Sequence, residues 1–220
     1  AKPTVGERCL FVTDPGLRKL GLCDAALADL EAAGVAVTVF DRVEADPSLA
    51  TLMAVTEAGR AADVTGVIGF GGGSSLDVAK LAALLLGSGE DLDAAWGVAN
   101  AKGPRLPLVL VPTTAGTGSE VTPVSIITVG EEEKRGVSSP VILPDIAVLD
   151  AELTLGLPPA ITAATGVDAM VHAIEAYASK SANNNPVSKL LAREALRLLG
   201  ANIETAVMDG TDVEARGAML

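Results

Sequence analysis

The chain alternates short, strongly apolar runs with longer segments whose apolar residues recur at helical spacing. The runs that predict β-strands are CLFVT at residues 9–13, VAVTVF at 35–40, VTGVIGF at 64–70, LPLVLVP at 106–112 and IAVLD at 146–150. The segments that predict helices between them are 24–34, closed by Gly34, 49–62, and 74–87, which Ser74 or Ser75 could cap and Gly87 could end. Strands that alternate with helices favour a parallel, doubly wound α/β sheet.

The pattern changes after LTLGLPPA, where no further strand follows. Helical spacing predicts helices over residues 160–179, 187–199, 201–207 and from 212 onward, with Pro186 well placed at a helix start after the loop KSANNNP. We therefore predict a Rossmann-like, nucleotide-type α/β domain over residues 1–157. The start of an all-helical domain follows over residues 158–220.

Composition excludes several classes of partner. Acidic residues outnumber basic ones by 28 to 16, and the formal charge of −12 should repel a nucleic acid. The longest apolar stretches are shorter than a membrane span, and the opening AKPTVGE has no signal-peptide character, so we expect no membrane. Cys9 and Cys23 have no metal-ligand spacing and are too few for a disulfide framework, which favours a reducing cytoplasm.

A glycine triplet lies where an apolar strand ends and a helix begins, in GFGGGSSLD. Gly72 and Gly73 let the backbone approach a ligand, and the helix start and the Ser74 hydroxyl can donate to phosphate oxygens. The alternative is a flexible turn, because the spacing matches neither the usual dinucleotide fingerprint nor a P-loop. Asp77 could be an acid in the first helical turn that the helix dipole favours.

A second unusual loop, PTTAGTGSE, follows the apolar run at 106–112. Thr113, Thr114 and Thr117 offer small hydroxyl donors at the carboxyl edge of the predicted sheet, where open α/β sheets bind ligands. A solvated, hydroxyl-rich turn is the alternative.

Two charged residues each have two possible roles, one in binding a cofactor and one in the local structure. Asp14, at the end of the first predicted strand, could accept hydrogen bonds from ribose hydroxyls and repel a 2′-phosphate, or it could cap a following helix. Lys134 in EEEKRG could reach cofactor oxygens, or it could belong to an exposed hairpin tip, which is the stronger interpretation for a lone lysine.

Asp168 and His172, the chain's single histidine, lie one helical turn apart in GVDAMVHAIEAY. The surrounding small and apolar residues predict a buried helix, on which an ionisable pair needs partners. One carboxylate and one imidazole suit Fe(II) or Zn(II) when further ligands come from elsewhere. The alternative is a hydrogen bond between the two side chains, which is favoured when the pair is taken alone.

The motifs taken in order resemble a known family. TDPG, GFGGGSSLDVAK, PTTAGTGSEVTP, LPDIAVLD and LPPAITAATGVDAMVHAIEAY are similar to the iron-containing, group III alcohol dehydrogenases. This is the family of lactaldehyde reductase, propanediol dehydrogenase and maleylacetate reductase. The resemblance spans essentially the whole chain and implies a dehydroquinate synthase-like architecture, with a dinucleotide at the sheet edge and a metal in the helical domain.

The resemblance also implies roles for single residues. Asp14 matches an acid associated with NAD preference, and Lys134 matches a lysine that contacts the cofactor. The family's pyrophosphate loop is matched by Gly72, Gly73, Ser74 and Asp77. The loop around the nicotinamide half is matched by Thr113, Thr114 and Thr117. Asp168 and His172 match the first two ligands of an iron ion, with zinc as the alternative. Two further histidines well downstream complete the set in the family, and this sequence has neither. It also lacks the N-terminal hairpin and helix that family members usually carry, so we expect a chain truncated at both ends. Asp46 stands where many members have asparagine, which would put an extra carboxylate near the nucleotide.

The implied activity is metal-dependent hydride transfer between a primary or secondary alcohol and NAD. A glycerol dehydrogenase-like or dehydroquinate synthase-like enzyme is an alternative. A second alternative, which the missing histidines favour, is a nucleotide-binding module without catalysis. The expected partners are a small alcohol or aldehyde substrate and further copies of the chain in a homo-oligomer of two subunits or more.

Overall fold

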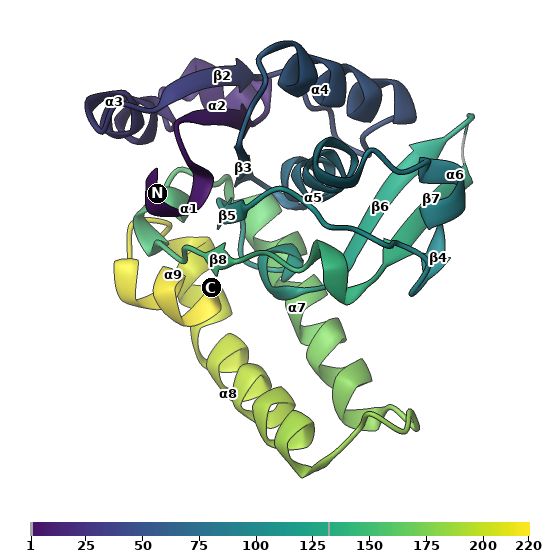
Figure 1. Cartoon of the computed structure of the whole chain (residues 1–220). Coiled ribbons are helices and arrows are strands. Elements are labelled where there is room, and N and C mark those ends of the chain that lie inside the picture. The colour runs from purple at the N-terminus through teal and green to yellow at the C-terminus, as the bar shows by residue number, and fades with distance from the viewer. Residues whose placement is uncertain (1, 132) are drawn as a thin grey trace. The chain divides into compact units, whose positions relative to one another are not determined.

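A computed structural model describes residues 2–131 and 133–220 (Figure 1). The chain divides into two compact units. The first comprises Ala1–Pro112 and Ser119–Val148, and the second comprises Thr113–Gly118 and Leu149–Leu220. No helix within the described ranges is long and apolar enough to cross a membrane.

The first unit contains a five-stranded sheet in which all neighbouring strands are parallel. Its strands, in spatial order, are β2 (Ala36–Phe40), β1 (Arg8–Val12), β3 (Gly66–Gly71), β5 (Leu108–Pro112) and β8 (Ile146–Ala147). Cys9 of β1 pairs with Val37 on one side and with Gly66 on the other. The predicted parallel α/β sheet is confirmed, and each predicted strand is present.

Helices cover both faces of this sheet. They are α1 (Lys2–Val5), α2 (Pro15–Leu20), α3 (Asp24–Ala32), α4 (Leu49–Ala61) and α5 (Gly73–Ser88). A short helix, α6 (Leu92–Ala95), follows α5 in the chain and lies away from this sheet (Figure 1). Gly66 and Gly69 point to opposite faces of β3 because side-chain direction alternates along a strand. A Cβ at Gly66 would lie 2.6 Å from the Val5 backbone of α1, and one at Gly69 would lie 2.7 Å from Ala79 of α5. These glycines let a helix approach each face.

The glycines near α5 act differently from the prediction. Gly72, not Ser74 or Ser75, is the N-cap, and the helix continues through Gly87 to Ser88 before Gly89 ends it in the left-handed conformation, at φ 65°. A Cβ at Gly87 would lie 2.5 Å from the backbone of Arg105 and Leu106. Gly87 therefore permits a close approach inside the helix instead of ending it.

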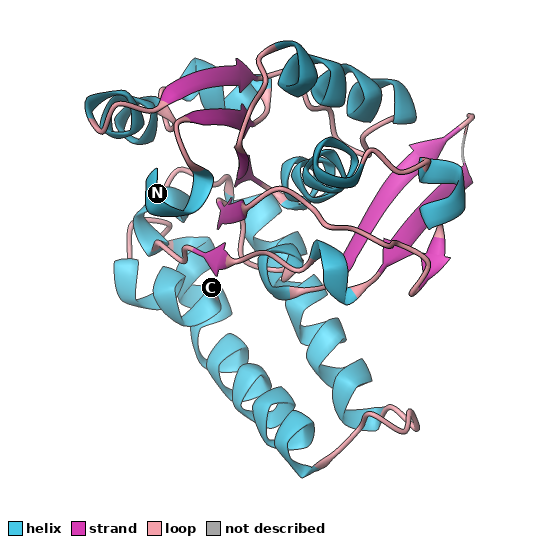
Figure 2. Ribbon diagram, in the orientation of Figure 1, coloured by secondary structure: helices cyan, strands magenta, loops and turns pink. Residues whose placement is uncertain are grey.

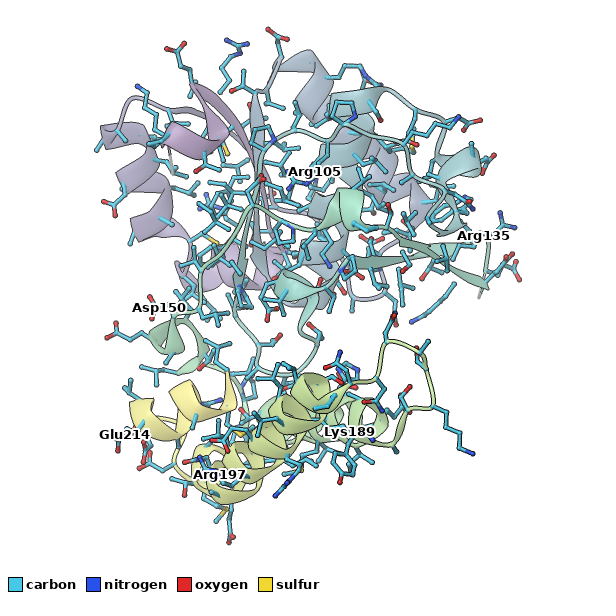
Figure 3. All side chains as sticks on the ribbon, turned by 60° about the horizontal axis from the view of Figure 1, so that its bottom comes forward. Arg105, Arg135, Asp150, Lys189, Arg197 and Glu214 are labelled. Atoms are coloured by element: carbon cyan, nitrogen blue, oxygen red, sulfur yellow. The ribbon has the colours of Figure 1, made fainter. Side chains whose placement is uncertain are left out.

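The residues before β8 are anchored to the start of β5 by an ion pair. Arg105, labelled in Figure 3, donates from Nη1 and Nη2 to the two carboxylate oxygens of Asp145 at 2.7 and 2.9 Å. The Leu108 amide also donates to Asp145, at 2.8 Å. This bidentate pair fixes the chain where a strand of only two residues joins the sheet.

A second, three-stranded sheet in the first unit was not predicted. Its strands are, in order, β4 (Gly97–Val98), β7 (Glu133–Ser138) and β6 (Val124–Val129), with β6 and β7 antiparallel. The sequence of β7, EKRGVS, is too polar to give a strand pattern, and Ile126 of β6 is exposed. Side chains of β6 nevertheless reach the core through Ser125 and Ile127.

The second unit is helical. Its helices are α7 (Pro159–Ala178), α8 (Pro186–Met208) and α9 (Val213–Met219), preceded by the short 3-10 helix η3 (Ala151–Thr154). Figure 2 shows α7 and α8 side by side, and the two pack together. The separate helices predicted over 187–199 and 201–207 are one helix, because the exposed Gly200 is tolerated in its interior. Asn185 begins it with a capping box, bonded to the amides of Val187 and Ser188.

Candidate functional site

The glycine loop, Gly71–Gly73, connects β3 to α5. Gly71 has φ 151°, and a Cβ there would lie 2.9 Å from the Ser75 hydroxyl, so this position requires glycine. Gly72 caps α5 through its backbone, with no side-chain hydrogen bond to the first amides of this 16-residue helix. Amides at a helix start have no partner within the helix and can bind anionic oxygens, and Ser74 lines the cavity beside this helix start.

Asp77 holds the first turns of α5 to β6 and its preceding turn. Its Oδ1 accepts a hydrogen bond from the Ser119 hydroxyl at 2.6 Å, and its Oδ2 accepts one from the Ile126 amide at 2.9 Å. The Asp77 carboxylate therefore makes hydrogen bonds within the protein, and these bonds position the start of α5 next to the glycine loop.

Beneath Asp77 lies a buried lysine that the sequence analysis missed. Lys80 is fully buried, lies 3.4 Å from Asp77 Oδ1, and donates to the Val124 carbonyl at 2.6 Å. Burial lowers the pKa of Lys80, and the Asp77 carboxylate opposes this shift. Burial likewise raises the pKa of the neighbouring Glu120 carboxyl. The available signal was the spacing of Lys80 three residues after Asp77, which places both on one helix face.

A cavity of about 160 Å³ opens beside the start of α5. It is lined by Asp46, Pro47, Ser74, Asp77, Ile126, Thr128 and Lys134. The structure therefore brings together Ser74, Asp77 and Lys134, which were selected from the sequence as cofactor contacts, and Asp46, which the resemblance predicted near the nucleotide.

Lys134 forms an ion pair with Asp46, 88 residues earlier in the chain. Its side chain is 54% exposed, so the prediction of an exposed charge is correct, but its partner is not one of the neighbouring glutamates. Lys134 pairs with Thr128 across β6 and β7, which places its ammonium group at the cavity wall.

Asp14 is the N-cap of α2. Its Oδ1 accepts hydrogen bonds from the Gly16 and Leu17 amides at 2.8 and 3.0 Å. The helix-cap alternative is therefore confirmed for this oxygen, while contact with a nucleotide stays a prediction.

The hydroxyl segment, Thr113–Gly118, groups with the second unit. Gly116 approaches α7 so closely that a Cβ would lie 2.4 Å from the Thr165 carbonyl oxygen. Thr165 lies one turn before Asp168, so the segment that carries Thr114 and Thr117 packs on the helix that carries the predicted metal ligands. Thr113 is buried.

Asp168 and His172 are more exposed than predicted. Their side chains are 47% and 53% exposed, because α7 buries only Thr162, Gly166 and Ala173 among its residues. His172 Nε2 lies 3.6 Å from Asp168 Oδ1, longer than a hydrogen bond. An ion bound at about 2.1 Å from each donor fits between them, since the two lengths together exceed their separation. Within the described residues no three His, Cys, Asp or Glu side chains gather around one point.

Comparison with known families matches most of the chain to one family. The model of the family described as "Iron-containing alcohol dehydrogenase" matches residues 2–151, and that of the "Fe-containing alcohol dehydrogenase family, C-terminal" matches residues 162–220.

Individual relatives agree. The sulfoacetaldehyde reductase of Bilophila wadsworthia is 40% identical over 98% of this chain and 55% of its own length. A crystal structure of 1,3-propanediol oxidoreductase has a TM-score of 0.92 and 38% identity, with coverage of 97% of this chain and 56% of that one. A sulfoacetaldehyde reductase from Bifidobacterium kashiwanohense in complex with NAD⁺ has a TM-score of 0.86 and 32% identity, with coverage of 98% and 56%. The chain thus spans about half the length of the relatives it matches.

Proposed function

Because the chain belongs to the iron-containing alcohol dehydrogenase family, we propose that the protein transfers a hydride between a primary or secondary alcohol and NAD. The reaction interconverts a small-molecule alcohol with an aldehyde or a ketone. The NAD⁺-bound relative of similar fold and the cavity at the start of α5 support the proposal. The observation that carries it is the half-exposed pair of Asp168 and His172, spaced to share one cation.

In this proposal the glycine loop binds the dinucleotide. The amides of Gly72 and Gly73 and the hydroxyl of Ser74 donate to pyrophosphate oxygens, and Asp77 keeps that turn against β6. The cavity of about 160 Å³ is smaller than the roughly 300–1,000 Å³ of sites that enclose whole ligands. It therefore fits one part of a dinucleotide, with Lys134 at its wall.

Contacts of four further residues with the dinucleotide are proposed from the family resemblance. Asp14 accepts hydrogen bonds from ribose hydroxyls through the oxygen that does not cap α2, which favours NAD over its 2′-phosphorylated form. Thr113, Thr114 and Thr117 orient the nicotinamide half.

Asp168 and His172 would hold two positions around a divalent cation. A carboxylate oxygen and an imidazole nitrogen accept iron and zinc alike. When bound, the cation supplies Lewis-acid stabilisation of charge on the alcohol oxygen, and NAD supplies the ring that accepts hydride. The exposure of both side chains leaves them accessible to an ion and to further ligands.

We also propose a cytoplasmic location and a homo-oligomer of two subunits or more. Cys9 and Cys23 are free and buried, and burial raises the pKa of the Cys9 thiol to about 12, so neither is poised for a disulfide. The mass of the protein in solution tests the oligomer.

Replacement of the metal ligands tests the proposed function. We expect Asp168→Asn and His172→Ala to abolish retention of iron and zinc, measured by elemental analysis, because each removes one of the two donors. NADH binding, followed by fluorescence, should remain measurable in both variants. Glu204→Gln removes an exposed carboxylate from α8 and should change neither property.

Two results would contradict the proposal. Turnover of alcohols that is unchanged in Asp168→Asn or His172→Ala would exclude the metal role of the pair. NADH binding without any alcohol-dependent reduction of NAD⁺ by the unchanged protein would instead indicate a nucleotide-binding module without catalysis.

A further inference from the structure

Asp46 is held at the cavity by a short, well-anchored loop. The Thr128 hydroxyl donates to the Asp46 carbonyl at 3.3 Å, and the Thr128 amide donates to the Pro47 carbonyl at 2.9 Å. Two residues before Asp46, Glu44 accepts hydrogen bonds from the Ser48 amide and the Thr51 hydroxyl. The backbone at Asp46 is therefore held by β6 and by the start of α4, and the Asp46 carboxylate pairs with Lys134.

The charged residues that line the cavity differ in their partners and in their exposure. Asp77 is neutralised from inside the protein by Lys80, and both of its oxygens accept further hydrogen bonds. Lys134 is the one cation among the lining residues, and Asp46 neutralises it. Since both side chains of this second pair are more than half exposed, a ligand can reach them.

The pairing changes what the cavity can recognise. An unpaired ammonium group is a phosphate-binding point charge. An ammonium group beside a carboxylate offers one donor and one acceptor, which matches two neighbouring hydroxyl groups that can each donate and accept. A phosphate placed there would gain the contact with Lys134 but would face the negative charge of Asp46.

We propose that Asp46 is a specificity-determining residue of this cavity, which makes the Lys134 end select sugar hydroxyls and reject phosphate. The inference rests on the proposed binding of a dinucleotide. In this proposal Asp46 excludes phosphate groups from the Lys134 end of the cavity. The phosphates then bind at the glycine loop, and the dinucleotide binds in a single orientation.

The backbone at Asp46 allows a clean substitution. Asp46 has φ 53°, in the left-handed region where asparagine is accommodated about as well as aspartate. Asp46→Asn therefore removes the charge without backbone strain. Asp63 is a matched control, since it also has a positive φ of 47°, is exposed, and pairs with Arg8 at 2.9 Å away from the cavity.

The test compares NADH binding with competition by inorganic pyrophosphate. In Asp46→Asn we expect the affinity for pyrophosphate relative to that for NADH to rise about tenfold, because Lys134 is released to bind phosphate. Lys134→Gln in the same variant should remove that gain. Asp63→Asn should keep the ratio of the unchanged protein.

The outcomes separate the two proposals. If the unchanged protein does not bind NADH, the proposed function fails and this inference fails with it. If NADH binds but the ratio in Asp46→Asn stays within about twofold of that in Asp63→Asn, only the role of Asp46 is overturned. A gain that survives Lys134→Gln would also overturn it, because the released cation would then not be responsible.

Discussion

At the scale of single residues, Gly116 links the hydroxyl segment to α7. The space for its missing side chain is filled by Thr165, whose carbonyl oxygen would lie 2.4 Å from a Cβ and whose own Cβ would lie at 2.8 Å. Both neighbouring atoms belong to a regular helix, so they cannot move aside without breaking its packing. The glycine is therefore required for close contact and not for an unusual φ.

We expect Gly116→Ala to lower the free energy of unfolding by about 1–3 kcal/mol, the cost of overpacking a tight contact. Gly156→Ala, in the same unit, adds a Cβ that meets nothing within 4 Å. That control should change stability by less than about 0.5 kcal/mol. Chemical denaturation of both variants measures the difference, and equal stabilities would contradict the packing argument.

The sequence allowed several site residues to be selected but not their contacts. Ser74 and Asp77 follow a glycine triplet at a strand end, which is a local signal, and the structure places both at the cavity. The spacing of Lys80 from Asp77 is a local signal, but the hydrogen bond from Lys80 to the Val124 carbonyl joins residues 44 positions apart and gives no signal in the sequence. The ion pair between Asp46 and Lys134 joins residues 88 positions apart, and only the folded chain brings them together.

At the scale of elements, the short strand β8 depends on the ion pair of Arg105 with Asp145. The hydrogen bond from Arg105 lowers the pKa of Asp145, and the bond from the Leu108 amide adds to this effect against the opposing effect of burial. A carboxyl whose pKa is lower in the folded chain stabilises the fold above its unfolded pKa, near pH 4, and loses that contribution as the pH falls through its folded pKa.

Asp145→Asn should therefore be less stable than the unchanged protein at pH 7, by about 1 kcal/mol for a partly exposed pair. The difference should shrink as the pH falls through the lowered pKa of Asp145 in the folded chain, and it should vanish once Asp145 is protonated in both states. Denaturation curves between pH 7 and pH 2.5 measure it. A difference that stays constant over this range would show that the charge of Asp145 does not matter.

Elements with strong apolar periodicity were predicted, and weakly patterned ones were not. The parallel strands and α4, α5 and α7 are present close to their expected bounds. The strand β7 was missed because EKRGVS owes its conformation to pairing with β6, a tertiary effect that local propensity does not report. The helix α8 was divided at Gly200 because glycine weakens a helical pattern without ending it.

At the scale of the whole molecule, the order of the motifs predicted an α/β part followed by a helical part. The boundary predicted between residues 157 and 158 stays a prediction. The structure groups Thr113–Gly118 with the helical residues, although this segment follows a strand of the first unit directly. The exposure of Asp168 and His172 could not be predicted, because the residues around them on α7 are apolar in sequence but remain largely uncovered.

The most direct test of the central claim is the absorbance of NADH formed from NAD⁺ and a panel of short alcohols and diols. It compares protein stripped by a chelator with the same protein reloaded with Fe²⁺ or Zn²⁺. We predict alcohol-dependent NADH formation that is lost on stripping, restored by one of the two ions, and not restored in His172→Ala. Equal rates with and without metal, or equal restoration in His172→Ala, would contradict the account.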